Sequence, residues 1–207
     1  MPTKHVKSRT KSKNVSRTKH TARNLFIFLL VAGGIALLIF AQWNDFEREY
    51  LYPKGYTDIV AKYAKEYKLD EDIIYAIINT ESGFDPNAVS DVGARGLMQI
   101  MEDAFDWVKS RMPEDDGATY DDMYDPELNI KYGAYLFYML YEEYGDYGTA
   151  LAAYHSGRGN VNGWLTDPSN SGNGKILDRN IPSRATAHYV DKVMTDFENY
   201  EKVYNIQ

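Results

Sequence analysis

Glu81 is the residue of this chain best placed to carry out acid chemistry. It ends an apolar run, and Ile74, Ile77, Ile78 and Glu81 share one face of a helix by their spacing. An apolar environment and the negative end of a helix dipole would both raise the pKa of this carboxyl group. A carboxylic acid that stays protonated near neutral pH can serve as a general acid. Periodicity also allows a second interpretation, in which Glu81 turns to solvent at a frayed helix end.

Other catalytic patterns have little support in the sequence. Cysteine is absent, so thiolate chemistry and Cys-ligated zinc are excluded. The four histidines lack metal-ligand spacing, and we expect neither a metal nor a cofactor. The glycines of residues 157–163 do not form a phosphate loop, and no serine lies in a G-x-S-x-G setting. Acid-driven cleavage of a glycosidic bond is therefore the leading reaction, and the 18 tyrosines suit either sugar binding or a core.

Apolar periodicity predicts an all-α domain over residues 56–207, which is enough chain for one core of ordinary size. Asp70 and Asp125 are expected to cap two of its helices, and Pro126 follows the second cap at the first helical position. We find no strand pattern and no internal repeat. The expected helices cover residues 56–67, 69–81, 97–108, 126–144 and 149–154, followed by a turn carrying Trp164 and a final helix from about Tyr189 to Tyr200.

The region before this domain differs from it in charge and hydropathy. Eight Lys and Arg residues precede the first acid, Asp45, which leaves 15 basic against 30 acidic residues in the remainder. Residues 1–24 have no apolar period and are predicted to form a disordered basic tail. Residues 25–43 form an uncharged apolar run long enough to span a bilayer, with Trp43 at an interfacial position. Residues 44–55 are interpreted as a linker that ends in Pro53 and Gly55.

The apolar run has two alternative interpretations, a cleaved signal peptide and a buried core helix. It is longer than a typical signal h-region, and Ile39-Phe40-Ala41 is a poor cleavage site, so we expect an uncleaved anchor. The position of the basic residues predicts a cytoplasmic N-terminus and an extracytoplasmic domain, at the cell membrane in a single pass. The tail is expected to contact anionic lipid and not nucleic acid.

Three motifs in succession resemble those of the soluble Slt-type lytic transglycosylases. They are Glu81-Ser82, the G-L-M-Q-I sequence of residues 96–100, and the A-A-Y-H-S-G sequence of residues 152–157. The sequences D-P-N-A-V-S at 85–90, G-A-R-G at 93–96 and D-P-E-L-N-I at 125–130 are also similar to the family pattern. The resemblance runs from about Tyr56 to Trp164.

The resemblance implies a goose-type, lysozyme-like helical fold and cleavage of the β-1,4 bond between MurNAc and GlcNAc in peptidoglycan. It implies that Glu81 protonates the leaving oxygen and then takes a proton from the C6 hydroxyl group, which closes a 1,6-anhydro ring without a cofactor. It also implies a set of substrate-binding residues. These are Ser82, Met98, Gln99, Tyr154, His155 and Tyr189.

Two departures from the family pattern concern the groove and not the acid. His155 stands where the family has Asn, so its charge would vary with pH. Ala185 and Ala187 stand where the family has Glu and Arg. Two rival functions stay open, a muramidase that hydrolyses with water and a wall-binding protein without turnover. Hydrolysis normally needs a second carboxylate, for which Asp85 and Asp91 are the nearest in sequence, and Asp85 is more simply a turn residue.

Overall fold

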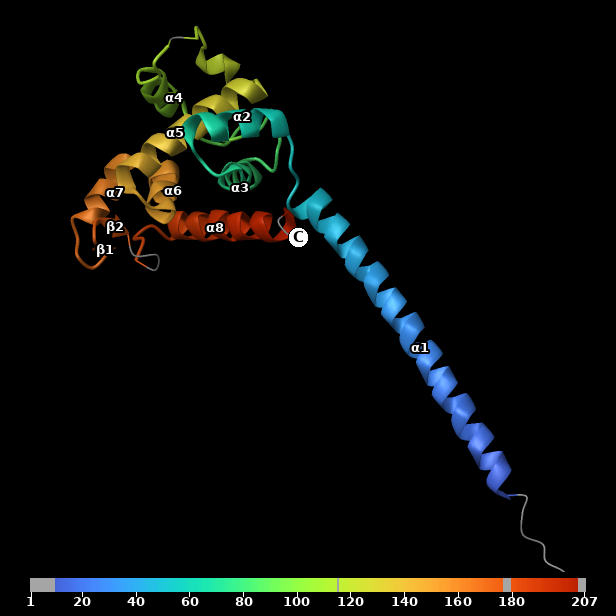
Figure 1. Ribbon diagram of the computed structural model, residues 1–207. Coiled ribbons are helices and arrows are strands. Elements are labelled where there is room, and N and C mark those ends of the chain that lie inside the picture. Colours follow the sequence, from blue (N-terminus) through green and yellow to red (C-terminus); the bar gives the residue numbers. More distant parts are fainter. Residues whose placement is uncertain (1–9, 115, 177–179, 205–207) are drawn as a thin grey trace, which may run out of the picture. The chain divides into compact units, whose positions relative to one another are not determined.

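The computed structural model describes residues 10–114, 116–176 and 180–204 (Figure 1). Internal contacts divide the chain into two units, Met1–Glu49 and Tyr50–Gln207, and each is described by itself.

The described part of the first unit consists of helix α1, Thr10–Phe46, and the beginning of the short π-helix Glu47–Leu51, whose last two residues belong to the second unit. Within the described residues, one helical stretch, Arg23–Leu51, is long and apolar enough to cross a membrane, and its most apolar 18 residues have a mean hydropathy of 2.6. A signal sequence near the N-terminus would meet the same criteria. Residues 10–24, for which the sequence predicts a disordered basic tail, are drawn as the first part of α1, and the disorder of the tail stays a prediction. Residues 1–9 lie outside the described residues.

The second unit is helical, and the all-α prediction is confirmed. Its longest elements are α5, Pro126–Tyr144, and α8, Arg184–Tyr204, and α5 packs against α2, α4 and α6. The other helices are α2, Thr57–Tyr67; α3, Glu71–Glu81; α4, Glu102–Lys109; α6, Tyr147–Ser156; α7, Arg158–Leu165; and the 3-10 helix Tyr120–Tyr124. The two short strands β1, Ser171–Gly172, and β2, Lys175–Ile176, pair in antiparallel fashion, which the sequence did not predict.

The predicted caps form as expected. The Asp70 carboxylate accepts a hydrogen bond from the Asp72 backbone N–H at 2.9 Å, and this bond fixes the start of α3. The Asp125 carboxylate accepts one from the Leu128 N–H at 2.9 Å, with Pro126 at the first position of α5. In Figure 1, α8 lies below α3 and α6 at the lower edge of the second unit, and it packs against both. The cap therefore fixes the start of α3, the helix that carries Glu81, and packing against α8 holds the helix in place.

Residues 52–54, at the C-terminal end of the predicted linker, make contacts within the second unit. The Tyr52 carbonyl oxygen accepts a hydrogen bond from the Tyr204 hydroxyl at 2.8 Å, and the Pro53 carbonyl oxygen accepts one from Tyr200 at 2.8 Å. Lys54 forms an ion pair with Asp72 at 2.7 Å. These partners lie far away in sequence, so a local pattern could not identify them.

The helix predicted over residues 97–108 begins only at Glu102. Residues before it form an irregular loop in which Arg95 pairs with both Val89 and Ile100, and Gln99 has a φ of 47°. Leu97 and Ile100 are buried as the apolar spacing indicates, but the loop and not a helix buries them. Backbone pairing across the loop therefore outweighs the local helical pattern.

Candidate active site

Glu81 is the last residue of α3, at the end of the face that its isoleucines form. Those isoleucines are fully buried, whereas the Glu81 side chain is partly exposed. Burial raises the pKa of Glu81 to about 7, against smaller opposing effects of the Tyr189 hydroxyl and the Lys192 charge. The predicted direction of the pKa shift is confirmed. Near neutral pH the carboxyl group is therefore present in both its protonated and its ionised form.

Two tyrosines, the partly buried Tyr154 and the buried Tyr189, lie beside the Glu81 carboxyl group. The Tyr154 hydroxyl donates to the Met98 carbonyl oxygen at 2.8 Å. Burial, together with the charge of Glu81, raises the pKa of both Tyr154 and Tyr189 well above the usual value, so both hydroxyls stay protonated. The Tyr189 hydroxyl is close enough to Glu81 to lower the pKa of its carboxyl group. It is the one buried side-chain oxygen or nitrogen without a partner in the described ranges, so it is available to a bound ligand.

A polar network joins α8 to the last turn of α3, next to Glu81. The Lys192 ammonium group donates to the Thr80 hydroxyl at 3.0 Å and pairs with the Asp196 carboxylate at 3.3 Å. That carboxylate also accepts hydrogen bonds from the Asn79 amide at 3.1 Å and from the Thr80 hydroxyl at 3.2 Å. The network holds a positive charge where it favours the ionised form of Glu81.

Ser82, Met98 and Gln99, three predicted substrate-binding residues, make internal contacts in this structure. The Ser82 hydroxyl donates to the Leu97 carbonyl oxygen at 2.8 Å. The Met98 side chain is fully buried and would contact any Cβ added at Gly133. The Gln99 amide nitrogen donates to carbonyl oxygens of the loop at 2.9 and 3.1 Å, which leaves its amide oxygen to accept. Ser82 and Met98 shape the loop here, and their contact with substrate stays a prediction.

Asn129 organises this loop, and the sequence analysis did not single it out. Its buried side chain accepts from the Met98 backbone N–H at 2.7 Å and donates to the carbonyl oxygens of Arg95 and Met123 at 2.9 and 2.8 Å. A polar residue one turn into an apolar helix was the signal that could have identified it. Asn129 thereby fixes the Met98 carbonyl oxygen that holds Tyr154.

His155 lies near the same site, at the C-terminal end of α6. Its Nδ1 is 3.2 Å from the Thr186 hydroxyl oxygen, and its ring centroid is 4.6 Å from that of Tyr189. Partial burial lowers the pKa of His155 below its usual value of 6.5. The two alanines that depart from the family pattern, Ala185 and Ala187, flank the buried Thr186 in the first turn of α8. The structure thus brings all the predicted site residues to one region around Glu81, its adjoining loop, and the ends of α6 and α8.

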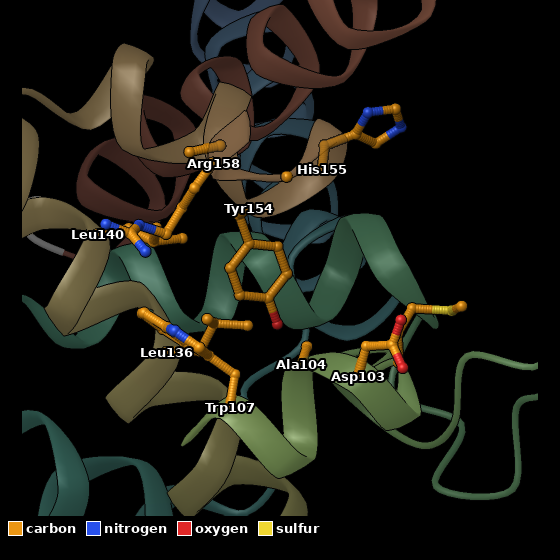
Figure 2. Close-up of a pocket in the computed structure, with 11 residues that line it drawn as sticks. Asp103, Ala104, Trp107, Leu136, Leu140, Tyr154, His155 and Arg158 are labelled. Atoms are coloured by element: carbon orange, nitrogen blue, oxygen red, sulfur yellow. The ribbon is translucent and has the colours of Figure 1, made fainter. Parts of the chain in front are cut away.

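A pocket of about 460 Å³ adjoins this region (Figure 2). Tyr154 stands in its centre, between Ala104 and Trp107 of α4 and His155 and Arg158 on the other side. Its remaining lining residues are Met101, Asp103, Leu136, Leu140, Ala153 and Gly157. Tyr154 both lines this pocket and lies next to Glu81, so it connects the pocket to the region of the acid.

The acidic residues that follow Glu81 most closely in sequence lie at the surface of the protein. Asp85 and Asp91 are exposed, and the Asp85 carboxylate accepts a hydrogen bond from the Asn87 N–H at 2.9 Å, as a turn residue does. Neither contributes to the pKa shift of Glu81. Across the described ranges, no cluster of three or more His, Cys, Asp or Glu side chains could hold a metal ion.

The chain is similar to known proteins over most of its length. The family model described as Transglycosylase SLT domain matches residues 58–177. The soluble lytic murein transglycosylase of Salmonella typhimurium is 28% identical over 190 residues, which cover 91% of this chain and 29% of that protein. The membrane-bound lytic murein transglycosylase C of Yersinia pestis is 30% identical over 172 residues, which cover 71% of this chain and 47% of that protein.

Solved structures show the same fold. One of them is the lytic transglycosylase Slt of Pseudomonas aeruginosa, in an inactive glutamate-to-glutamine form, which is 29% identical and superposes with a TM-score of 0.66. The matched region covers 74% of this chain and 25% of the Pseudomonas chain. The chain therefore spans less than a third of the soluble relatives that it matches. Because the family match extends over more than half of its length, the chain belongs to the transglycosylase SLT domain family.

Proposed function

We propose that this protein is a peptidoglycan lytic transglycosylase anchored in the cell membrane. It would cleave the MurNAc–GlcNAc β-1,4 bond and leave a 1,6-anhydroMurNAc end. The observation that carries the proposal is the pKa of about 7 of Glu81, in a site with two protonated tyrosines. The printed names of the similar proteins, lytic murein transglycosylases, support the same chemistry.

Glu81 serves in turn as acid and base in this mechanism. The protonated carboxyl group gives its proton to the glycosidic oxygen as the bond from C1 to that oxygen breaks. The resulting carboxylate takes the proton of the C6 hydroxyl as O6 bonds to C1, so no water is consumed and Glu81 returns to its starting form. A pKa near the working pH suits both transfers. The free hydroxyl of Tyr189 is a hydrogen-bond donor for the sugar or for the ionised carboxylate.

Hydrolysis is the second candidate, and it has less support from the site. A glycoside hydrolase normally uses two carboxylates about 5 to 9.5 Å apart. Besides burial, the groups that affect the pKa of Glu81 are the side chains of Tyr189 and Lys192, and no other carboxylate is among them. A single carboxyl group surrounded by hydroxyl groups favours ring closure by the sugar's own hydroxyl.

Product analysis tests the proposed reaction. The full chain in detergent is incubated with purified peptidoglycan, and the soluble muropeptides are measured by mass spectrometry. Anhydro ends, one water lighter than reducing ends, are expected. Reducing ends would instead indicate a muramidase, and binding to sacculi without release would indicate a wall-binding protein.

The anchor and its orientation are a separate proposal, supported by the apolar stretch and by the basic residues before it. Protease added to intact, wall-stripped cells is expected to digest the catalytic unit and to leave a membrane-protected N-terminal fragment. Disruption of the cells before protease treatment is the control for access to the tail. Protection of the catalytic unit in intact cells, or a soluble mature form that begins near Gln42, would contradict the proposed anchor.

His155→Asn is expected to flatten the activity profile at acid pH. The pKa of His155 is lowered from 6.5, whereas that of Glu81 is raised to about 7. Protonation of the imidazole therefore affects the acid side of the pH–activity profile, and ionisation of Glu81 affects the alkaline side. An imidazolium ion beside Tyr189 disfavours the protonated form of Glu81, so the variant should keep relatively more activity near pH 5. Rates of anhydro-product release are measured from pH 5 to 8. Identical profiles would show that His155 has only a structural role.

A further inference from the structure

A second pocket lies on the side of α5 away from Glu81 and has no role in the mechanism above. Its volume is about 510 Å³. Lys131, Tyr135 and Tyr138 of α5 line it, whereas Leu136 and Leu140 line the pocket beside Tyr154. At about 100° per residue these two sets occupy nearly opposite faces of the helix. The remaining lining residues are Glu66, Tyr67, Arg111, Met112, Pro113 and Glu114.

The aromatic part of this pocket is a cluster of three tyrosines. The ring centroid of Tyr67 is 5.1 Å from that of Tyr135 and 6.0 Å from that of Tyr138, and the Tyr67 and Tyr138 rings are stacked. The Tyr135 hydroxyl donates to the Arg111 carbonyl oxygen at 3.0 Å. The Tyr67 hydroxyl is next to the Glu66 carboxylate, which helps to raise the pKa of Tyr67. No hydrogen bond of the Tyr138 hydroxyl is found in the part of the chain that the structure describes, so this hydroxyl can bond to a ligand.

The charged groups around the pocket balance one another. Glu66 and Glu114 oppose Arg111 and Lys131, and Lys131 is already paired with Asp116 at 2.7 Å. The Arg111 guanidinium donates to the Trp107 carbonyl oxygen at 3.2 Å. Because the cations are engaged and the charges of the lining cancel, the pocket does not select an ion. It offers aromatic rings, the Tyr138 hydroxyl group and charged groups of both signs, which suit a neutral polyhydroxy ligand.

We propose that this pocket is a second saccharide-binding site, which holds a segment of N-acetylated glycan away from the bond that is cut. A pyranose ring has an apolar C–H face that can lie against a tyrosine and a rim of hydroxyls that can bond to polar neighbours. The identification of the ligand as a peptidoglycan strand rests on the proposed function. Two sites on opposite faces of α5 would let the enzyme retain the wall while Glu81 acts at a different place.

Binding is tested with the full chain in detergent, carrying Glu81→Gln so that no turnover intervenes. Tetra-N-acetylchitotetraose is titrated into ¹⁵N-labelled protein and followed by NMR. Two separate groups of resonances are expected to shift, one around residue 81 and Tyr154 and one around Tyr67, Tyr135 and Tyr138. Shifts confined to the first group would overturn the proposal.

Substitutions at Tyr138 test the site and not merely the fold. Tyr138→Leu keeps apolar volume but removes the aromatic face and the hydroxyl, and about tenfold weaker binding is expected at the second site alone. Tyr138→Phe, which keeps the ring, should lose less. Tyr141→Leu is the matched control, since Tyr141 is a half-buried tyrosine of the same helix that packs against Tyr147, outside the pocket. An equal effect of Tyr138→Leu and Tyr141→Leu, or none in either Tyr138 variant, would refute the assignment.

Turnover separates this proposal from the proposed function. In the otherwise native chain, Tyr138→Leu should raise the KM for intact sacculi several-fold and leave kcat/KM for a short soluble glycan unchanged. An equal loss on both substrates would indicate a disturbed fold and would also overturn the second site. If the native chain cleaves neither substrate, the proposed function fails, while the NMR titration still decides whether the pocket binds saccharide.

Discussion

Replacement of Glu81 by Gln is expected to lower the release of anhydromuropeptides by about 10⁴-fold, the upper end of the usual contribution of a positioned acid or base. One carboxyl group carries both proton transfers in the proposed mechanism, so no second residue compensates for its loss. The glutamine side chain keeps the shape and hydrogen bonding of the protonated acid but cannot give up a proton. A similar structure is that of a lytic transglycosylase described as inactive with a Glu-to-Gln change.

Wild type and variant are compared at matched concentrations of folded protein, with circular dichroism and binding to sacculi as checks. Glu71→Gln is the matched control, because it removes an exposed carboxylate from the first turn of the same helix. That variant should retain its activity. A Glu81→Gln protein that folds, binds and still releases anhydro product within about tenfold of wild type would exclude Glu81 as the catalyst.

The same substitution should stabilise the folded protein at alkaline pH. The pKa of Glu81 rises from 4.5 in the unfolded chain to about 7 in the folded protein, so below pH 4.5 the carboxyl group is protonated in both states and has no effect. Between these values the unfolded state ionises first, and above pH 7 the folded state bears the full cost of a buried charge. At about 1.4 kcal/mol per pKa unit, Glu81→Gln should gain on the order of 3 kcal/mol above pH 7 and nothing below pH 4.5. Denaturant unfolding at both extremes of pH measures this difference.

The parts of this structure that the sequence predicts are those that depend on local chemistry. Apolar spacing locates the helices, and the carboxylates of Asp70 and Asp125 mark the starts of α3 and α5 because a cap needs only residues two or three positions away. The placement of Glu81 after its isoleucines follows from the same short-range rule. Its raised pKa follows in turn from the burial of that face.

The parts that the sequence does not predict depend on distant partners. The helix expected from Leu97 fails because Arg95 pairs with Ile100 and because the Asn129 amide, on another helix, binds the loop's backbone. The contact between Lys192 and Thr80 joins residues 112 positions apart, and no periodicity encodes it. Nor does any motif reveal that the Tyr189 hydroxyl lacks a partner, since this depends on everything packed around it.

Gly96→Ala is expected to be the most destabilising of the conservative changes around the site. Gly96 has a φ of 74°, in the left-handed region that favours glycine. A Cβ added there would overlap the Met123 carbonyl oxygen and the Asn129 side-chain amide. The backbone conformation alone costs about 1–2 kcal/mol for a residue with a Cβ. The overlap adds to this cost, because neither the backbone oxygen nor the fully bonded amide can move without breaking a hydrogen bond.

Gly117→Ala separates the two causes. Gly117 also has a φ of 74°, but a Cβ there meets nothing within 4 Å. The free energy of unfolding of the Gly117→Ala control should therefore fall by about 1–2 kcal/mol, from the backbone conformation alone. For Gly96→Ala it should fall by at least about 3 kcal/mol. Near-ultraviolet circular dichroism during denaturant unfolding of the full chain measures both values. Equal losses would show that the contact between Gly96 and Asn129 does not hold the loop.

Activity connects the Gly96 substitution to catalysis, through a chain of contacts that ends at Glu81. Asn129 binds the Met98 N–H, the Met98 carbonyl oxygen accepts from Tyr154, and Tyr154 lies beside the acid. An Asn129 side chain displaced by the added Cβ would release Met98 and let Tyr154 turn away from Glu81. Gly96→Ala should therefore lower kcat, even at temperatures where the protein is fully folded, by about tenfold or more, as a misplaced catalytic environment does. Wild-type kcat in a folded Gly96→Ala protein would mean that Tyr154 holds its position without the loop.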